Sequence, residues 1–423
     1  MQTLEPSSTR QNIQRATLDN GITLIVIENP TADIIAGRLF LKNAGNRVES
    51  PSQAGLSHLL STVITKGTAT LNAAEIAEKI ESVGAGINAE TANDYFSLSL
   101  KTVSQDFPEI LALVGEMMRA PSFPDNEVEL EQALTLQAIV AQQEQPFNLA
   151  FNQLRSQMYP QHPYGSPVLG TQETVSALTA ADLQSYHQTY FRPDNLVISL
   201  SGRITLEKGI TEVNKVFGDW QIPATPQPTP SLTSPTPQPD QKFLYQETQQ
   251  SIIMLGYLTA SVKNSDYPIL KLLNTYLGNG LSSRLFVELR EKQGLAYDVS
   301  SLYPTRLEPS YFVTYMGTAP NNIETAYQGL RQEVKRLCEV ELTPEELQAS
   351  KNKLLGQYAL GKQSNGQLAQ LFGWYETLNQ GLEFDDRFQE MVAEVTSEQM
   401  QAVAQKYLQV DPYISLVGAT QLC

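Results

Sequence analysis

Three polar side chains in one short segment could do chemistry together. His58, Ser61 and Thr62 lie in QAGLSHLLSTVITK, residues 53–66, where the apolar spacing predicts a helix that ends at Gly67. Because residues three and four positions apart share one face of a helix, their side chains would be neighbours. An imidazole in such a group could activate a serine hydroxyl, or it could bind a metal ion with the help of stronger donors.

The composition restricts both possibilities. The chain of 423 residues contains three histidines and two cysteines, which are His58, His162, His187, Cys338 and Cys423. Two distant thiols provide neither a disulfide framework nor a Cys-rich zinc site, and three scattered histidines need carboxylates to complete a metal site. A serine nucleophile is disfavoured, because no carboxylate is evident to orient His58 and no strained turn presents Ser61. The alternative is that His58 is a helix residue with a structural hydrogen bond.

The charge balance excludes one large class of partner. Lys and Arg number 29 against 45 for Asp and Glu, so the formal net charge is −16 and no basic excess exists to bind nucleic acid. An acidic surface could attract basic peptides, or it could serve solubility alone. No stretch approaches about 18 apolar residues, and residues 1–15 contain no apolar signal segment. We expect no membrane span and a soluble compartment, either a bacterial cytoplasm or one like a plastid stroma.

A proline-rich segment divides the chain. Residues 221–240, QIPATPQPTPSLTSPTPQPD, hold seven of the 24 prolines and predict an extended linker. On either side, residues 84–139 and 294–354 share a pattern of a glycine-led strand, an alternating strand, an amphipathic helix and a Pro/acidic cap that opens a long helix. This pattern indicates a tandem duplication.

The duplication predicts an α+β fold of two homologous domains. We place the domains at residues 1–220 and 241–423, each with a sheet that is backed by helices. An Asn-Gly pair in TLDNGITLIVIENP predicts a hairpin, and NLVISLSGRI and SIIMLGYL are apolar runs typical of buried strands.

The segment AGLSHLLSTVITKGT resembles the zinc motif of the pitrilysin/insulinase peptidases, also called inverzincins. There the inverted motif H-x-x-E-H supplies two zinc-binding histidines one helical turn apart and a general base between them. Other blocks are similar to the family as well, namely AEKIESVGAGINAETANDY, HPYGSPVLGT, YFRPDNLVISLSG and LGNGLSSRLFVELREKQGLAYDV. The resemblance covers nearly the whole chain.

The chain departs from the family at the metal-binding positions. His58 matches the first zinc histidine, but Ser61 replaces the general base and Thr62 replaces the second histidine. The third ligand is a glutamate in a later helix, and Ala138 is nearest to its position here. Neutral hydroxyls are poor zinc ligands, and a serine hydroxyl is too weak a base to deprotonate a zinc-bound water. We therefore expect no metal and no catalytic residue in this chain.

Two other elements of the family are retained. Arg290 and Tyr297 match an Arg/Tyr pair that binds substrate in the family, where the half opposite the zinc contributes it. The alternative is a solvated Arg290 paired with Glu288 or Glu291, and a Tyr297 ring in the core. Asn88 and Ala89 match a strand whose edge pairs with extended substrate in the family; here a protected edge is equally possible.

The resemblance implies a LuxS/processing-peptidase-like metalloenzyme fold in which two domains form a half-shell. In the processing-peptidase-like branch, one chain carries H-x-x-E-H and a homologous chain without it supplies the Arg/Tyr pair. We expect this chain to be the non-catalytic, substrate-binding subunit of such a heterodimer, inactive alone, with zinc on the partner subunit and unfolded peptides as substrate. The segment GNGLSSR is short, which favours a bacterial or plastid relative over the mitochondrial subunit. The alternatives are a scaffold or assembly protein without a peptidase partner, and a peptide-binding homodimer.

Overall fold

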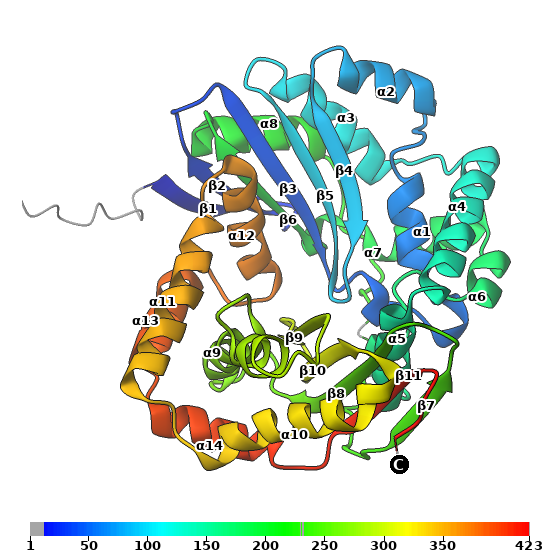
Figure 1. Cartoon of the computed structure of the whole chain (residues 1–423). Coiled ribbons are helices and arrows are strands. Elements are labelled where there is room, and N and C mark those ends of the chain that lie inside the picture. Colours follow the sequence, from blue (N-terminus) through cyan, green and yellow to red (C-terminus); the bar gives the residue numbers. More distant parts are fainter. Residues whose placement is uncertain (1–11, 229, 231, 423) are drawn as a thin grey trace, which may run out of the picture. The chain divides into compact units, whose positions relative to one another are not determined.

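The computed structural model describes residues 12–228, 230 and 232–422 (Figure 1). The chain packs into two compact units, and each is built from segments that are distant in the sequence. Unit 1 comprises Met1–Thr135, Val168–Pro230 and Leu360–Leu382, and unit 2 comprises Leu136–Pro167, Ser231–Ala359 and Glu383–Cys423. No helix in the described part of the chain combines the length and apolarity needed to cross a bilayer.

Unit 1 contains a mixed six-stranded sheet. Its strands are β1 (Ile13–Thr17), β2 (Thr23–Glu28), β3 (Ile34–Lys42), β4 (Gly86–Thr91), β5 (Tyr95–Val103) and β6 (Leu196–Gly202). They lie in the order β1-β2-β6-β3-β5-β4, in which only the β2–β6 pair is parallel. The predicted hairpin is confirmed, because β1 and β2 pair on either side of a turn at which Gly21 has φ of 87°. β4 is an edge strand.

Helices cover both faces of this sheet. The helices with residues in unit 1 are α1 (Leu56–Val63), α2 (Ala73–Glu81), α3 (Phe107–Arg119), α4 (Asp125–Gln143), α6 (Gln172–Ala177), α7 (Ala180–Tyr190), α8 (Leu206–Phe217) and α12 (Asn365–Thr377). α3 and α8 pack on one face with the main apolar core, and α12 packs on the other against β3 and β6 (Figure 1). Because both faces are covered, every residue of β6 is buried, as its apolar run predicts.

Unit 2 repeats this plan. Its strands are β7 (Gln241–Tyr245), β8 (Ser251–Thr259), β9 (Asp298–Leu302), β10 (Ser310–Thr318) and β11 (Tyr413–Gly418). The order β7-β11-β8-β10-β9, with only β7–β11 parallel, reproduces β2-β6-β3-β5-β4 of unit 1. The predicted α+β fold with two helix-backed sheets is therefore confirmed.

The helices of unit 2 also lie on both faces of their sheet. They are α5 (Pro146–Met158), α9 (Tyr267–Gly278), the π-helical turn η6 (Phe286–Glu291), α10 (Ile323–Glu339), α11 (Pro344–Leu360), α13 (Phe384–Glu394) and α14 (Ser397–Leu408). α10 and α14 pack beside β8, while α5 packs on β8 and β11 from the other side (Figure 1).

Each unit takes one of its helices from the other half of the sequence. α5 precedes the proline-rich segment 221–240 but belongs to unit 2, and α12 follows that segment but belongs to unit 1. The described residues of 221–240 form neither helix nor strand. The packing thus divides the chain differently from the predicted halves 1–220 and 241–423, because the second face of each sheet is closed by an exchanged helix.

The close approach of α12 to its sheet gives a test of this packing. A Cβ atom at Gly373 would lie 2.5 Å from a ring carbon of Phe40 and 2.8 Å from Cβ of Ser199. We expect Gly373→Ala to lower the unfolding free energy by about 1–2 kcal/mol, since overpacking outweighs the gain in helix propensity. Gly356→Ala in α11 is the control, because nothing lies within 4 Å of its Cβ position and it should stabilise by about 0.5–1 kcal/mol. Denaturant unfolding measures both changes, and two stabilising substitutions would contradict the packing.

Candidate functional site

Helix α1, which carries the candidate residues, begins at a carboxylate. Oε2 of Glu49 accepts a hydrogen bond from the backbone N–H of Gly55 at 3.1 Å, and Oε1 accepts one from that of Ser57 at 2.6 Å. Gly55 has φ of 94°, which a residue with a side chain rarely adopts. Burial raises the pKa of Glu49 to about 7, although these N–H donors favour the ionised form. The start of α1 is thus fixed by the loop before it.

The two hydroxyls beside His58 are occupied by the backbone of their own helix. Oγ of Ser61 donates to the carbonyl oxygen of His58 at 2.7 Å, and Oγ1 of Thr62 donates to that of Leu59 at 2.9 Å. Such bonds to a preceding carbonyl are the usual way in which a helix satisfies a serine or threonine. Neither hydroxyl donates to the His58 imidazole in this arrangement, so the geometry lacks the contact that a Ser–His nucleophile requires.

A half-buried ion pair lies near His58. Glu131 of α4 is 8% exposed, and its Oε1 lies 3.0 Å from Nζ of Lys66, just beyond the end of α1. Burial lowers the pKa of His58, and the Glu131 charge opposes that shift. Glu131 is therefore a nearby carboxylate, but its negative charge is already neutralised by a lysine.

This set of donors does not fit zinc. Structural and catalytic zinc sites use three or four His, Cys or carboxylate donors. Here the available groups are the His58 imidazole, two hydroxyls that are hydrogen bonded to their own helix, and a carboxylate that is paired with a lysine. Ala138, about two turns after Glu131 on α4, has only a methyl group. Within the described residues, no three His, Cys, Asp or Glu side chains are grouped so that they could hold a metal ion.

Asn88 and Ala89 lie on the edge strand β4. They pair with Ser99 and Leu98 of β5, and the Ala89 side chain packs on the core of unit 1 while Asn88 is exposed. The hydroxyl of Thr91, the last residue of β4, donates to Oγ of Ser57 at 3.1 Å and so joins the strand to α1. An extended chain could hydrogen bond to such an edge through the backbone alone.

The structure brings Arg290 and Tyr297 together in unit 2. Nη1 of Arg290 donates to the carbonyl oxygen of Tyr297 at 2.7 Å, and its guanidinium lies 5.0 Å above the Phe286 ring. The Tyr297 side chain is 62% exposed, so its ring does not lie in the core. Glu288 contacts Arg284 and Lys292 instead, and no described carboxylate lies within 4 Å of Arg290. The pair is a surface feature with a guanidinium available to a ligand.

The ion pair between Lys66 and Glu131 was not predicted from the sequence. A signal for Lys66 was present, because His58, Thr62 and Lys66 are spaced four residues apart, which predicts one helical face. For Glu131 no local signal exists, since only the tertiary packing of α4 brings it to Lys66.

The fold defines a two-domain chain in which each domain is a sheet backed by helices. Residues 23–172 match the family described as insulinase (peptidase family M16), and residues 177–354 match the peptidase M16 inactive domain. The chain belongs to peptidase family M16, the insulinase/pitrilysin family.

Relatives and solved structures agree with this assignment. The chain is 29% identical over 375 residues to the uncharacterized zinc protease YmxG of Bacillus subtilis. The aligned region covers 87% of this chain and 90% of that protein. It is 28% identical to an uncharacterized zinc protease of Streptomyces coelicolor, over 96% of this chain and 89% of that protein. Among solved structures, a peptidase M16 inactive domain from Pseudomonas fluorescens has a TM-score of 0.90 at 24% identity, covering 97% of this chain and 99% of that one. A protease from Helicobacter pylori also has a TM-score of 0.90, at 23% identity, covering 96% and 98%.

The ion pair near His58 predicts a stability difference. Lys66→Ala should lower the unfolding free energy by about 1–3 kcal/mol, because it leaves the buried Glu131 carboxylate without a cation. Glu131→Gln in the same chain should recover part of the loss. Lys79→Ala is the control, since Lys79 and Glu109 form an exposed pair at 3.4 Å that should contribute under about 0.5 kcal/mol. Equal losses for Lys66→Ala and Lys79→Ala in denaturant unfolding would show that the pair near His58 has no special role.

The raised pKa of Glu49 predicts how the unfolding free energy changes with pH. Its folded pKa of about 7 exceeds the ordinary value of 4.5, so the folded protein holds a proton that the unfolded chain releases. This carboxyl makes the unfolding free energy fall as pH rises from about 4.5 to 7, by up to about 3 kcal/mol.

Comparison with Glu49→Gln isolates this contribution. The variant should gain stability relative to the natural chain between pH 5 and pH 8, as measured by urea unfolding at each pH. Burial lowers the pKa of His187 to about 4, so this residue makes the unfolding free energy fall as the pH falls below 6.5. Because His187 is present in both chains, its effect cancels in the comparison. A difference between the chains that is independent of pH would contradict the assignment.

Proposed function

We propose that this chain is the non-catalytic, substrate-binding subunit of a heterodimeric zinc endopeptidase that acts on unfolded peptides. The partner subunit is a homologous chain with an intact H-x-x-E-H motif, and the zinc ion belongs to that partner. One observation carries the proposal: the metal-binding positions Ser61, Thr62 and Ala138 have no donors for zinc, while Arg290 and Tyr297 form an exposed pair.

The exposed pair can bind and polarise a peptide bond. A guanidinium has five N–H donors in a planar fork, and only the Nη1 bond to Tyr297 is used within the described chain. The remaining donors can hold a substrate carbonyl oxygen, while the exposed Tyr297 hydroxyl can donate to an oxygen that becomes negative at the scissile bond. When zinc is bound on the partner, it supplies a polarised water at neutral pH.

The edge strand supports an unfolded substrate. A substrate peptide can add to β4 as a further strand by hydrogen bonding to the backbone of Asn88 and Ala89. This contact recognises an extended main chain and does not require a particular side-chain sequence. An unfolded peptide can present an extended main chain anywhere along its length, whereas most strands of a folded protein are already paired, so this mode of binding favours unfolded peptides. The net charge of −16 additionally favours the approach of basic segments.

Co-expression with the partner tests the proposal. The chain is produced together with an H-x-x-E-H homologue encoded in the same genome, and cleavage of a fluorogenic unfolded peptide is measured for the mixture and for each chain alone. We expect cleavage only by the mixture, with about one zinc per heterodimer. Arg290→Ala with Tyr297→Phe should lower kcat/KM by about 100-fold or more, since two donors to the reacting peptide are lost.

A matched double variant controls for nonspecific effects. Arg331→Ala with Tyr245→Phe removes an exposed arginine and an exposed tyrosine hydroxyl elsewhere on unit 2 and should leave kcat/KM unchanged. If kcat/KM of the Arg290→Ala, Tyr297→Phe variant were unchanged, these two residues would not bind or polarise the substrate. Cleavage by this chain alone, or about one tightly bound zinc per isolated chain, would overturn the proposal. A stable complex without cleavage would indicate a scaffold, and peptide binding by a homodimer would indicate the third alternative.

A further inference from the structure

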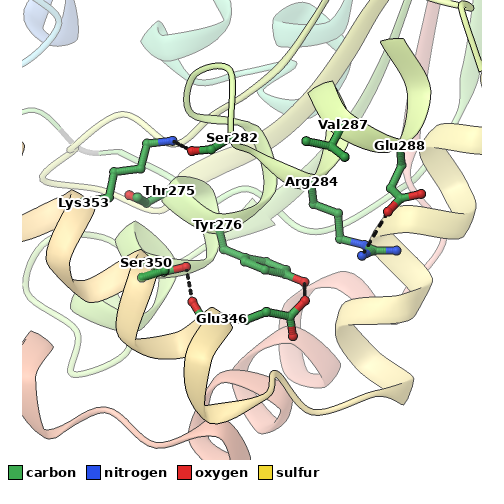
Figure 2. A pocket seen from close by; sticks show the side chains of 10 residues that line it. Thr275, Tyr276, Ser282, Arg284, Val287, Glu288, Glu346, Ser350 and Lys353 are labelled. Carbon is green, nitrogen blue, oxygen red and sulfur yellow. Dashed lines mark hydrogen bonds and ion pairs between the residues drawn. The ribbon is translucent and has the colours of Figure 1, made fainter. Parts of the chain in front are cut away.

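A pocket of about 300 Å³ lies in unit 2 (Figure 2). Its walls come from the end of α9, the loop that follows α9, the turn η6 and the first half of α11. This volume is at the lower end of the range for small-ligand sites and suits one or two amino-acid residues. Figure 2 shows the Tyr276 ring between Lys353 on one side and Arg284 on the other.

The two cations that line this pocket differ in their partners. Arg284 lies 3.6 Å from Glu288 and forms a close ion pair with Glu333, so its charge is neutralised. Lys353 is held by neutral groups, because Nζ donates to Oγ of Ser282 at 3.2 Å and to the carbonyl oxygen of Asn279. No described carboxylate lies within 4 Å of it, and burial lowers its pKa. The third N–H donor of the Lys353 ammonium is available.

The two carboxylates of the pocket are already satisfied. Glu288 contacts Arg284 and also accepts from Lys292 at 2.9 Å. Glu346 accepts from the Tyr276 hydroxyl at 2.8 Å and from the backbone N–H of Thr343 at 2.9 Å, at the start of α11. Of the two cations that line the pocket, Lys353 is therefore the one without a carboxylate within 4 Å among the described residues. A ligand with a single negative charge supplies an opposite charge for Lys353 and is repelled less by Glu288 and Glu346 than a phosphate dianion would be.

The rest of the pocket offers apolar contact next to this cation. Val287 of η6 and Ala349 of α11 line the pocket, and the Tyr276 ring is held in place by its bond to Glu346 (Figure 2). Oγ of Ser282 accepts from Lys353, so its hydrogen is free to donate to a second ligand oxygen. Two donors beside apolar surface match a carboxylate that is attached to an apolar residue.

We propose that the Lys353 pocket binds the carboxylate of a peptide, with Lys353 and Ser282 as donors and Val287 and Ala349 in contact with the adjoining apolar side chain. The carboxylate comes from the peptide C-terminus or from an acidic side chain. Val287 and Arg290 lie three positions apart on η6, so this one turn contributes both to the pocket and to the exposed Arg290–Tyr297 pair. The site does not depend on a peptidase partner, and its test uses this chain alone.

Calorimetric titration of the purified chain with blocked peptides tests the site. The probes are acetyl-Ala-Leu as the free acid, its C-terminal amide, acetyl-Ala-Asp-Ala-amide and inorganic phosphate. We expect the acid to bind at least ten-fold more tightly than the amide, and Lys353→Gln to abolish that preference. Ser282→Ala should reduce it several-fold, and this variant keeps the test valid if Lys353→Gln does not fold.

Lys351→Gln is the matched control on the same helix. Its Nζ donates to the carbonyl oxygen of Ala393 at 2.7 Å and does not line the pocket, so the preference for the acid should persist. Binding of the Asp peptide as tightly as the acid supports the carboxylate site and shows that it accepts a side-chain carboxylate as well as a C-terminal one. Weaker binding of the Asp peptide assigns the source to the C-terminus. Equal affinity for acid and amide, a preference that survives Lys353→Gln, or tighter binding of phosphate would overturn the proposal.

Discussion

Burial of the second face of each sheet is the constraint on which the rest of this structure depends. A central strand such as β6 or β8 is apolar along nearly its whole length, so neither of its faces can be left in water. The helices next to each sheet in the sequence cover one face only. α12 closes unit 1 at Gly373 and α5 closes unit 2, where Leu154 and Met158 approach Gly256. Each half of the chain therefore completes its core with a helix from the other half.

Helix α1, which carries His58, Ser61 and Thr62, is fixed at both ends by side-chain contacts. α1 is held at its start by Glu49 and beyond its end by the Lys66–Glu131 ion pair, and neither interaction uses a metal ion. The hydroxyls of Ser61 and Thr62 bond to carbonyl oxygens of their own helix and demand no outside partner. The charge of Glu131 is paired with Lys66. The position of α1 is therefore fixed by contacts among the described side chains and backbone groups.

The chemistry that remains is directed at peptides. In unit 1 it is the backbone edge of β4, and in unit 2 it is the Arg290–Tyr297 pair and the pocket around Lys353. These features share one property, because each offers hydrogen-bond donors or acceptors without a group that can activate water. Binding and polarisation of a peptide, as proposed for this chain, are compatible with such a surface.

The sequence by itself determined the class of fold, the repeated plan and the residues at the metal-binding positions. Periodicity and the duplicated pattern are local properties, so the hairpin at Gly21 and the buried strands β6 and β8 could be predicted from single segments. The absence of a carboxylate at Ser61 and of an imidazole at Thr62 needs no structure at all. The proximity of Arg290 to Tyr297 followed from motif spacing, but their exposure did not.

Only the tertiary structure decided which groups neutralise one another. Glu131 meets Lys66, Arg284 meets Glu333, and Lys353 meets no carboxylate, although all of these residues look alike in the sequence. The exchange of α5 and α12 between the units was equally hidden, because an amphipathic helix does not specify which sheet it covers. Ion pairing and helix docking join residues that are distant along the chain, and this is the physical reason that local patterns could not predict them.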